Sequence, residues 1–132
     1  MRRTLIVLSA AILLSGCGVK PDAPEAASTK AEYKKISPAE ASEMMSDGAI
    51  VLDVRTQGEY DKGHIEGATL LPVGEIRDMA ESVVPDKNAV IVVYCRTGVR
   101  SESAAKELIA MGYANVFDFG GIEDWPGETV TE

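Results

Sequence analysis

Residues 89–112 read AVIVVYCRTGVRSESAAKELIAMG and carry the strongest structural signals of the chain. Its first six residues, 89–94, are apolar and rich in β-branched side chains, which predicts a strand that is buried on both faces. Residues 101–111 carry apolar side chains on one stripe, which predicts an amphipathic helix that Gly112 ends. A buried strand that leads through a short loop into a helix is typical of α/β domains.

Strand and helix signals alternate along the rest of residues 33–132. Ser37, Pro38 and Glu40 form a helix start, because a serine cap, a proline in the first turn and a capping-box glutamate agree. Gly48 is expected to end that helix. The other predicted elements are strands at 50–54, 68–71 and 116–118 and a helix at 74–83. We therefore expect one α/β domain with a mostly parallel central sheet flanked by helices.

Length and charge limit the possible functions. The chain has 132 residues, enough for one domain, and 21 acidic against 13 basic side chains give a net charge of −8. This balance argues against nucleic acid as a partner, because neutralising phosphates requires an excess of Lys and Arg. A small anionic substrate is not excluded, because it responds to the local field of a pocket.

The N-terminus has the pattern of a targeting signal. Arg2 and Arg3 form a basic start, and residues 5–14 are an apolar run that only Ser9 interrupts. About ten apolar residues are too few for a membrane-spanning helix, which needs roughly 20. The pattern therefore favours a signal peptide over a permanent span.

Residues 14–17, Leu-Ser-Gly-Cys, resemble the lipobox of bacterial lipoproteins. The resemblance implies that residues 1–16 are a signal peptide and that lipid is attached to Cys17; an ordinary cleaved signal is the alternative. Residues 17–32, rich in Pro, Ala, Glu, Lys and Ser, are then a flexible tether to the domain. We expect the protein in the cell envelope, anchored to a membrane outside the cytoplasm. Because Gly18 rather than Asp follows the cysteine, the outer membrane is favoured in a cell with two.

Processing would change the charge and the thiol content of the chain. Removal of residues 1–16 takes away two arginines and no acid, so the net charge goes from −8 to −10. Lipidation of Cys17 leaves Cys95 as the only thiol, which excludes a disulfide within the mature chain. Cys95 is therefore the side chain whose role has to be explained.

Residues 95–100, Cys-Arg-Thr-Gly-Val-Arg, link the strongest predicted strand to the amphipathic helix. Ligands of parallel α/β sheets bind beyond the carboxyl ends of the strands, where this loop lies. Its backbone N–H groups are expected to turn toward the cysteine sulfur, with Gly98 at positive φ. The positive end of the helix and the charges of Arg96 and Arg100 favour thiolate over thiol. An inert core cysteine is disfavoured by the polar residues that follow it.

This loop resembles the active-site loop of the rhodanese family, C-R-x-G-x-R. Further motifs agree with that family in order and spacing: residues 53–55, 59–60, 63–65 and 67–68 before the loop, and 112–113, 115–116, 120–122 and Trp125 after it. The resemblance covers residues 33–130. It implies a single rhodanese-like domain, α/β with a mostly parallel sheet, over residues 33–132.

The resemblance implies a thiosulfate sulfurtransferase-like enzyme that works by double displacement. The Cys95 thiolate would attack a small anionic donor such as thiosulfate, release sulfite and keep a persulfide. A thiophilic acceptor (cyanide, a thiol or a protein cysteine) would then remove the sulfur. Such nucleophilic catalysis requires no metal and no organic cofactor. The expected substrate-binding residues are Arg96, Thr97, Gly98, Val99 and Arg100.

Two residues of the preceding strand end are expected to support the loop. An acid that ends a buried strand is costly unless it is paired, which favours a hydrogen-bonding role over catalysis for Asp53. Arg55 is expected to pair with Glu59. For Arg96 and Arg100 two interpretations stay open: contact with donor oxygens, or no more than charge neutralisation and contact with solvent.

Two other functions compete with the sulfurtransferase. One is a sulfur-carrier or redox-interaction module that serves a protein partner in the cell envelope. The other is a phosphatase-like enzyme, which the loop length disfavours. Cys95 to Arg100 are six residues, as in sulfurtransferases, whereas related phosphatases carry one residue more and so form a wider cradle.

Overall fold

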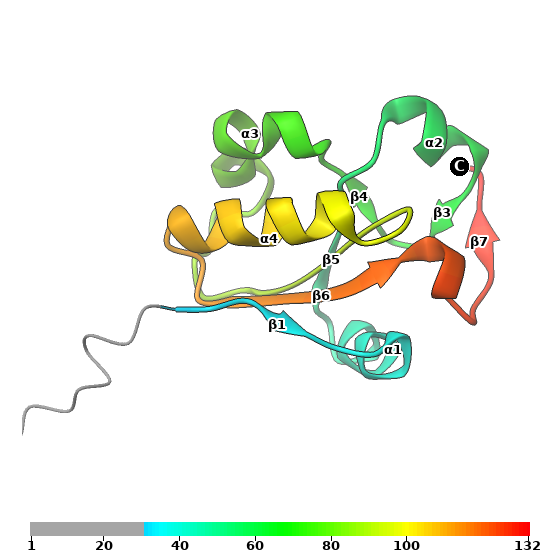
Figure 1. The fold of residues 1–132 in the computed structure, drawn as a ribbon, viewed down its shortest axis with the longest axis horizontal. Helices are drawn as coiled ribbons and strands as arrows, with labels where there is room; N and C mark the ends of the chain where they lie inside the picture. The colour runs from blue at the N-terminus through cyan, green and yellow to red at the C-terminus, as the bar shows by residue number, and fades with distance from the viewer. Residues whose placement is uncertain (1–30) are drawn as a thin grey trace, which may run out of the picture.

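The computed structural model describes residues 31–132; the predictions for the signal peptide, Cys17 and most of the tether lie outside the described residues. A five-stranded sheet with the order β1-β6-β5-β2-β4 forms the centre, and all its pairings are parallel (Figure 1). Its strands are β1 (Lys34–Lys35), β2 (Ile50–Asp53), β4 (Thr69–Leu70), β5 (Val90–Cys95) and β6 (Asn115–Gly121). A second, antiparallel sheet pairs β3 (His64–Ile65) with β7 (Thr129–Val130).

Helices cover both faces of the central sheet (Figure 1). Helices α3 (Ile76–Val83) and α4 (Val99–Ala110) lie on one face, and α1 (Pro38–Ser46) lies on the other. The side chains of β5 alternate between these layers: Ile91, Val93 and Cys95 belong to the core under α3 and α4, and Val92 and Tyr94 to the core over α1. This two-sided burial explains why the β5 sequence is continuously apolar.

The predicted fold class is confirmed, and so are most of the longer elements. Helix α1 begins at Pro38 with the expected capping box: the Ser37 Oγ accepts a hydrogen bond from the Glu40 N–H at 3.2 Å, and the Glu40 carboxylate accepts one from the Ser37 N–H at 2.7 Å. Strands β2 and β5 and helix α3 lie where the apolar patterns predict them.

Several boundaries differ from the predictions. Helix α4 begins at Val99 instead of Ser101, because Gly98, with φ +110°, takes the cap position itself. Strand β4 is shorter than residues 68–71, and β6 continues past Asp118 to Gly121. The first residues of the helix predicted at 74–83 form a separate helical turn, Val73–Glu75. The sequence did not predict helix α2 (Gln57–Lys62), the short helical turn Ile122–Asp124, or the two-residue strands β1, β3 and β7.

Strand β6 changes register beside Cys95. Val93 pairs with Asp118, but the next residue, Tyr94, pairs with Gly120, so one residue of β6 is extra and forms a β-bulge. The Asp118 carboxylate accepts a hydrogen bond from the Gly120 N–H at 2.8 Å. The bulge places the carbonyl oxygen of Gly120 3.2 Å from the hydroxyl of Ser101, in the first turn of α4.

None of the helices between Ala31 and Glu132 has the length and the apolar character that a membrane span requires.

Candidate active site

Cys95 is the last residue of β5, and it is fully buried. Its Sγ accepts a hydrogen bond from the Gly98 N–H at 2.9 Å and lies 3.6 Å from the Ser101 Oγ. The backbone N–H groups of Thr97 and Ser101 also donate toward the sulfur. The loop therefore wraps the sulfur in hydrogen-bond donors, as its length and composition led us to expect.

Two glycines permit this close packing of the loop. Gly98 has φ +110°, a conformation that other residues adopt only with strain. Gly121 in β6 lies directly against the loop, and a Cβ at this position would overlap the carbonyl oxygen of Arg96. Strand β6 can therefore pack this closely against the backbone of Arg96 and Thr97 only with glycine at position 121.

The environment of Cys95 lowers the pKa of its thiol. Burial alone raises that pKa, but the hydrogen bonds from the Ser101 hydroxyl and from the N–H groups of Ser101, Gly98 and Thr97 outweigh burial. The Ser101 N–H belongs to the first turn of α4, which is the positive end of that helix, and Gly98 is its cap residue. The donors of Thr97, Gly98 and Ser101 around the sulfur, here called the cradle, therefore stabilise the thiolate with neutral dipoles.

The two arginines of the loop are paired with acids from other segments. Arg100 donates from both Nη atoms to the Glu59 carboxylate, at 2.6 and 2.9 Å, and these bonds lower the pKa of Glu59 to about 2. Arg96 donates from Nε to Glu123 at 3.0 Å, and its side chain is 66% exposed. The two ion pairs Arg96–Glu123 and Arg100–Glu59 thus lie at the solvent-facing edge of the loop, here called the rim.

The predicted ion pair between Arg55 and Glu59 is wrong. Arg55 binds Asp53 instead, from Nε at 2.9 Å and from Nη2 at 2.6 Å, and its own N–H donates to the same carboxylate at 3.0 Å. The Asp53 side chain is fully buried and Arg55 is 6% exposed, so neither charge has water to compensate it. Pairing with each other avoids a penalty of several kcal/mol per ion, whereas Glu59 on α2 faces the loop and takes Arg100.

Tyr94 completes the Asp53 network. Its hydroxyl donates to Asp53 at 2.7 Å and accepts from the Ile65 N–H at 3.1 Å. Burial and the hydrogen bond to Asp53 both raise the pKa of Tyr94. The Asp53 carboxylate therefore binds Arg55 and Tyr94, on the face of the sheet opposite Cys95, and makes no hydrogen bond to residues 96–100 of the loop that it was expected to support.

Comparison with known proteins places this loop in a family. Residues 37–128 match the family described as Rhodanese-like domain. The chain belongs to this family. Thiosulfate sulfurtransferase GlpE of Pseudomonas entomophila is 40% identical over 103 residues, which are 74% of this chain and 93% of that protein. Thiosulfate sulfurtransferase PspE of Escherichia coli is 38% identical over 73 residues, 55% of this chain and 70% of that protein.

Solved structures agree with the sequence relatives. A structure described as rhodanese with anions from E. coli has a TM-score of 0.61 and 34% identity, and the match covers 64% of this chain and all of that one. A rhodanese-related protein from Thermoplasma volcanium has a TM-score of 0.67 and 29% identity over 76% of this chain and all of that one. The family and the enzyme class, a rhodanese-type sulfurtransferase, are thereby confirmed.

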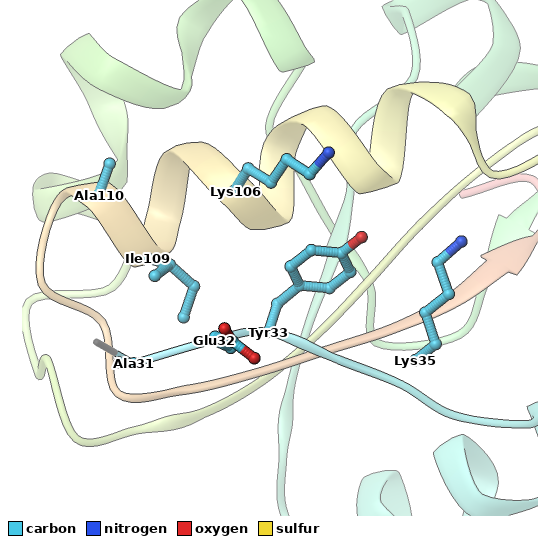
Figure 2. A pocket seen from close by; sticks show the side chains of 7 residues that line it. All are labelled: Ala31, Glu32, Tyr33, Lys35, Lys106, Ile109 and Ala110. Carbon is cyan, nitrogen blue, oxygen red and sulfur yellow. The ribbon is translucent and has the colours of Figure 1, made fainter. Parts of the chain in front are cut away.

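A pocket of about 360 Å³ opens at the rim of the rhodanese-like loop. Its lining includes Arg96 and Glu123 of one rim pair, Glu59 of the other, and Arg55. A pocket of about 530 Å³ lies elsewhere, between β1 and α4 (Figure 2). It is lined by Ala31, Glu32, Tyr33 and Lys35 and by Lys106, Ile109 and Ala110. Of these two pockets, the smaller one borders the Cys95 loop, through Arg96, and is therefore the candidate entrance to the site.

Sequence reasoning missed Ser101, Tyr94 and Glu123 as parts of the site. A serine in the first turn of a helix resembles a cap, and a tyrosine in an apolar strand resembles core. Only the strand alternation signals that Tyr94 and Cys95 face opposite layers. Among residues 31–132, no group of three His, Cys, Asp or Glu side chains is placed to hold a metal ion.

Proposed function

We propose that this rhodanese-like protein moves a sulfane sulfur from a small anionic donor such as thiosulfate to a thiophilic acceptor, through a persulfide on Cys95. The observation that carries the proposal is the buried Cys95 sulfur at the carboxyl end of β5, 2.9 Å from the Gly98 N–H and under the first turn of α4. The thiosulfate sulfurtransferase relatives support thiosulfate as the donor.

In the first half-reaction the Cys95 thiolate attacks the outer sulfur of thiosulfate. A bond forms between Sγ and that sulfur, and the bond from the outer sulfur to the sulfonate sulfur breaks. Its electron pair leaves with sulfite, and the negative charge of the enzyme moves from Sγ to the outer sulfur of the persulfide. The backbone N–H groups of Thr97 and Gly98, which already donate to Sγ, are the donors nearest to this new anion.

Donor oxygens can recruit the rim arginines. The Arg96–Glu123 pair is exposed, and exposed pairs contribute about 0–1 kcal/mol, so Arg96 can turn from Glu123 to a sulfonate at little cost. Arg100, held by two hydrogen bonds to Glu59, keeps a positive charge beside the entrance. Val99, which is 76% exposed, contributes backbone rather than side chain to the anion site.

The test uses the full chain with Cys17→Ser, purified in detergent, so that Cys95 is the only thiol. Thiosulfate should add the mass of one sulfur atom under non-reducing conditions, and cyanide should remove it as thiocyanate. The matched control, which also carries Cys95→Ser, should show neither. A wild-type Cys95 that gains no sulfur from thiosulfate or from a polysulfide overturns the proposal.

A protein acceptor is the alternative within the same chemistry. Steady-state turnover with thiosulfate and cyanide or a small thiol supports an enzyme of small molecules. A persulfide that only a protein thiol discharges would instead support the sulfur-carrier or redox-interaction module in the cell envelope.

We also propose that the chain is a lipoprotein anchored through Cys17 outside the cytoplasmic membrane. The basic start, the short apolar run and the Leu-Ser-Gly-Cys motif of residues 14–17 support this. Cys17→Ala should abolish incorporation of labelled lipid and release the protein from the membrane fraction. Unchanged membrane association of this variant would contradict the anchor.

A further inference from the structure

Ser101 lies beside the reacting sulfur, and its hydroxyl is a side-chain donor to the Cys95 thiolate. It is fully buried in the first turn of α4. Its Oγ lies 3.1 Å from the carbonyl oxygen of Gly98, 3.2 Å from that of Gly120 and 3.6 Å from the Cys95 Sγ. Three possible acceptors therefore surround one hydroxyl.

A hydroxyl has one proton, so Ser101 can donate to only one of these acceptors at a time. When Cys95 is a thiol, its S–H donates to the Ser101 oxygen, and the serine proton goes to a carbonyl. When Cys95 is a thiolate, the sulfur is the strongest acceptor of the three, because hydrogen bonds to an ion are about twice as strong as neutral ones. The carbonyl of Gly98 keeps the Glu102 N–H as a partner, at 3.1 Å.

We propose that Ser101 is a switching hydrogen-bond donor that turns to Sγ when charge develops there, and that it therefore accelerates discharge of the persulfide more than its formation. This inference rests on the proposed function. Ser101 contacts the reacting atom Sγ directly, and the bulge in β6 supplies the Gly120 carbonyl on which its proton rests when Sγ carries no charge.

The two half-reactions differ in the direction of charge transfer at Sγ. In discharge by cyanide, the cyanide carbon bonds to the outer sulfur, the Sγ–S bond breaks, and its electron pair stays on Sγ while thiocyanate leaves. Negative charge appears on Sγ, and a donor at this atom stabilises the transition state. In loading, Sγ loses negative charge, and the same hydrogen bond makes the thiolate a weaker nucleophile.

The experiment compares Ser101→Ala with wild type in the full chain with Cys17→Ser. Loading by thiosulfate and discharge by cyanide are timed separately in rapid-mixing experiments, at a pH where the thiol is fully ionised in both proteins. We expect discharge to slow about 10-fold, which corresponds to about 1.4 kcal/mol. Loading should be unchanged or about 2–3-fold faster, because a thiolate of higher pKa is the better nucleophile.

Two further variants separate chemistry from packing. Ser103→Ala removes an exposed hydroxyl from the same helix and should leave both rates unchanged. Ser101→Thr keeps a hydroxyl and should restore discharge to within about 3-fold of wild type. If Ser101→Ala does not fold, Ser101→Val takes its place and is compared with Ser101→Thr, because valine has nearly the shape of threonine without the hydroxyl.

Each outcome bears on a distinct statement. Equal slowing of both half-reactions, or no slowing of discharge, overturns the role of Ser101 and leaves the proposed function intact. A wild-type chain that forms no persulfide overturns both.

Discussion

Two buried polar groups lie at the carboxyl ends of neighbouring strands, on opposite faces of the sheet. Asp53 of β2 and Tyr94 of β5 are in register and belong with Arg55 to the α1 side. Cys95, one residue further along β5, faces α4. The first group holds a full negative and a full positive charge within 2.6 Å, and the second holds a sulfur among neutral donors.

Burial of a charged group serves structure on one face of the sheet and chemistry on the other. Both oxygens of the Asp53 carboxylate accept hydrogen bonds from Arg55, and one also accepts from Tyr94, so the carboxylate is occupied by structural partners. The Cys95 sulfur has neutral hydrogen-bond donors around it, which favour its negative charge but do not bind it in an ion pair. A sulfur atom that gains and loses charge requires this second kind of environment.

The largest expected effect is on the cradle. Cys95→Ser should reduce sulfur transfer at least about 1,000-fold, because a serine hydroxyl is not ionised near neutral pH and forms no persulfide. The melting temperature should change by only a few degrees, because the two side chains are close in size. Thiocyanate release and thermal unfolding followed by circular dichroism measure the two effects; residual turnover above one part in a hundred would point to another nucleophile.

Removing one charge from the Asp53 group should cause the largest loss of stability. Asp53→Ala leaves Arg55 buried without its partner, and the free energy of unfolding should fall by about 3–5 kcal/mol. Asp61→Ala, which removes an exposed carboxylate on α2, is the matched control and should stay within about 0.5 kcal/mol of wild type. Denaturant unfolding decides, and equal effects of the two variants would mean that the network is dispensable.

Tyr94→Phe tests whether the two faces are independent. The variant removes one hydrogen bond to Asp53 and leaves the Ile65 N–H without its acceptor, so unfolding should become easier by about 1–3 kcal/mol. The pKa of Cys95, measured from the pH dependence of alkylation, should not move, because the hydroxyl lies on the other face. A shift of that pKa would show that the faces communicate.

The smallest effect is expected at the rim and depends on pH. The pKa of Glu59 is about 2 in the folded protein because Arg100 binds its carboxylate, and about 4.3 is usual in an unfolded chain. A lowered pKa stabilises the fold above the unfolded-state value, and this stabilisation is lost as the pH falls from about 4.3 toward 2.

Glu59→Gln should therefore flatten the acid limb of the stability curve and cost at most about 1 kcal/mol at pH 7. Denaturant midpoints measured between pH 2 and 7 test this. An unchanged acid limb in the variant would assign that limb to other carboxylates.

Sequence alone predicted the parts of the fold that local physics determines. The capping box of α1, the apolar runs of β2 and β5 and the glycine at position 98 all depend on neighbours within a few residues. Helix α2 escaped prediction because it has six residues, none of them buried, and so shows no apolar period. The two-residue strands are too short for any alternation to show.

Pairings between distant segments of the site could not be predicted, because no local sequence pattern encodes them. Arg55 and Glu59 are close in sequence, but Glu59 binds Arg100, 41 residues away. The bulge that brings Gly120 to Ser101 depends on how β6 pairs with β5, which no pattern within β6 reveals. The loop around Cys95 is one short segment and was predictable. The residues that contact this loop come from α2, α4, β6 and the turn Ile122–Asp124.

Helix α4 separates the two ends of the domain. Its 12 residues span about 18 Å, with the Cys95 loop directly before Val99; at the far end, Ala31 lines one pocket together with Ile109 and Ala110 (Figure 2). The described chain therefore starts near the end of α4 that is remote from the sulfur. In a chain anchored as proposed, the sulfur site and the point where the tether joins the domain therefore lie at opposite ends of α4.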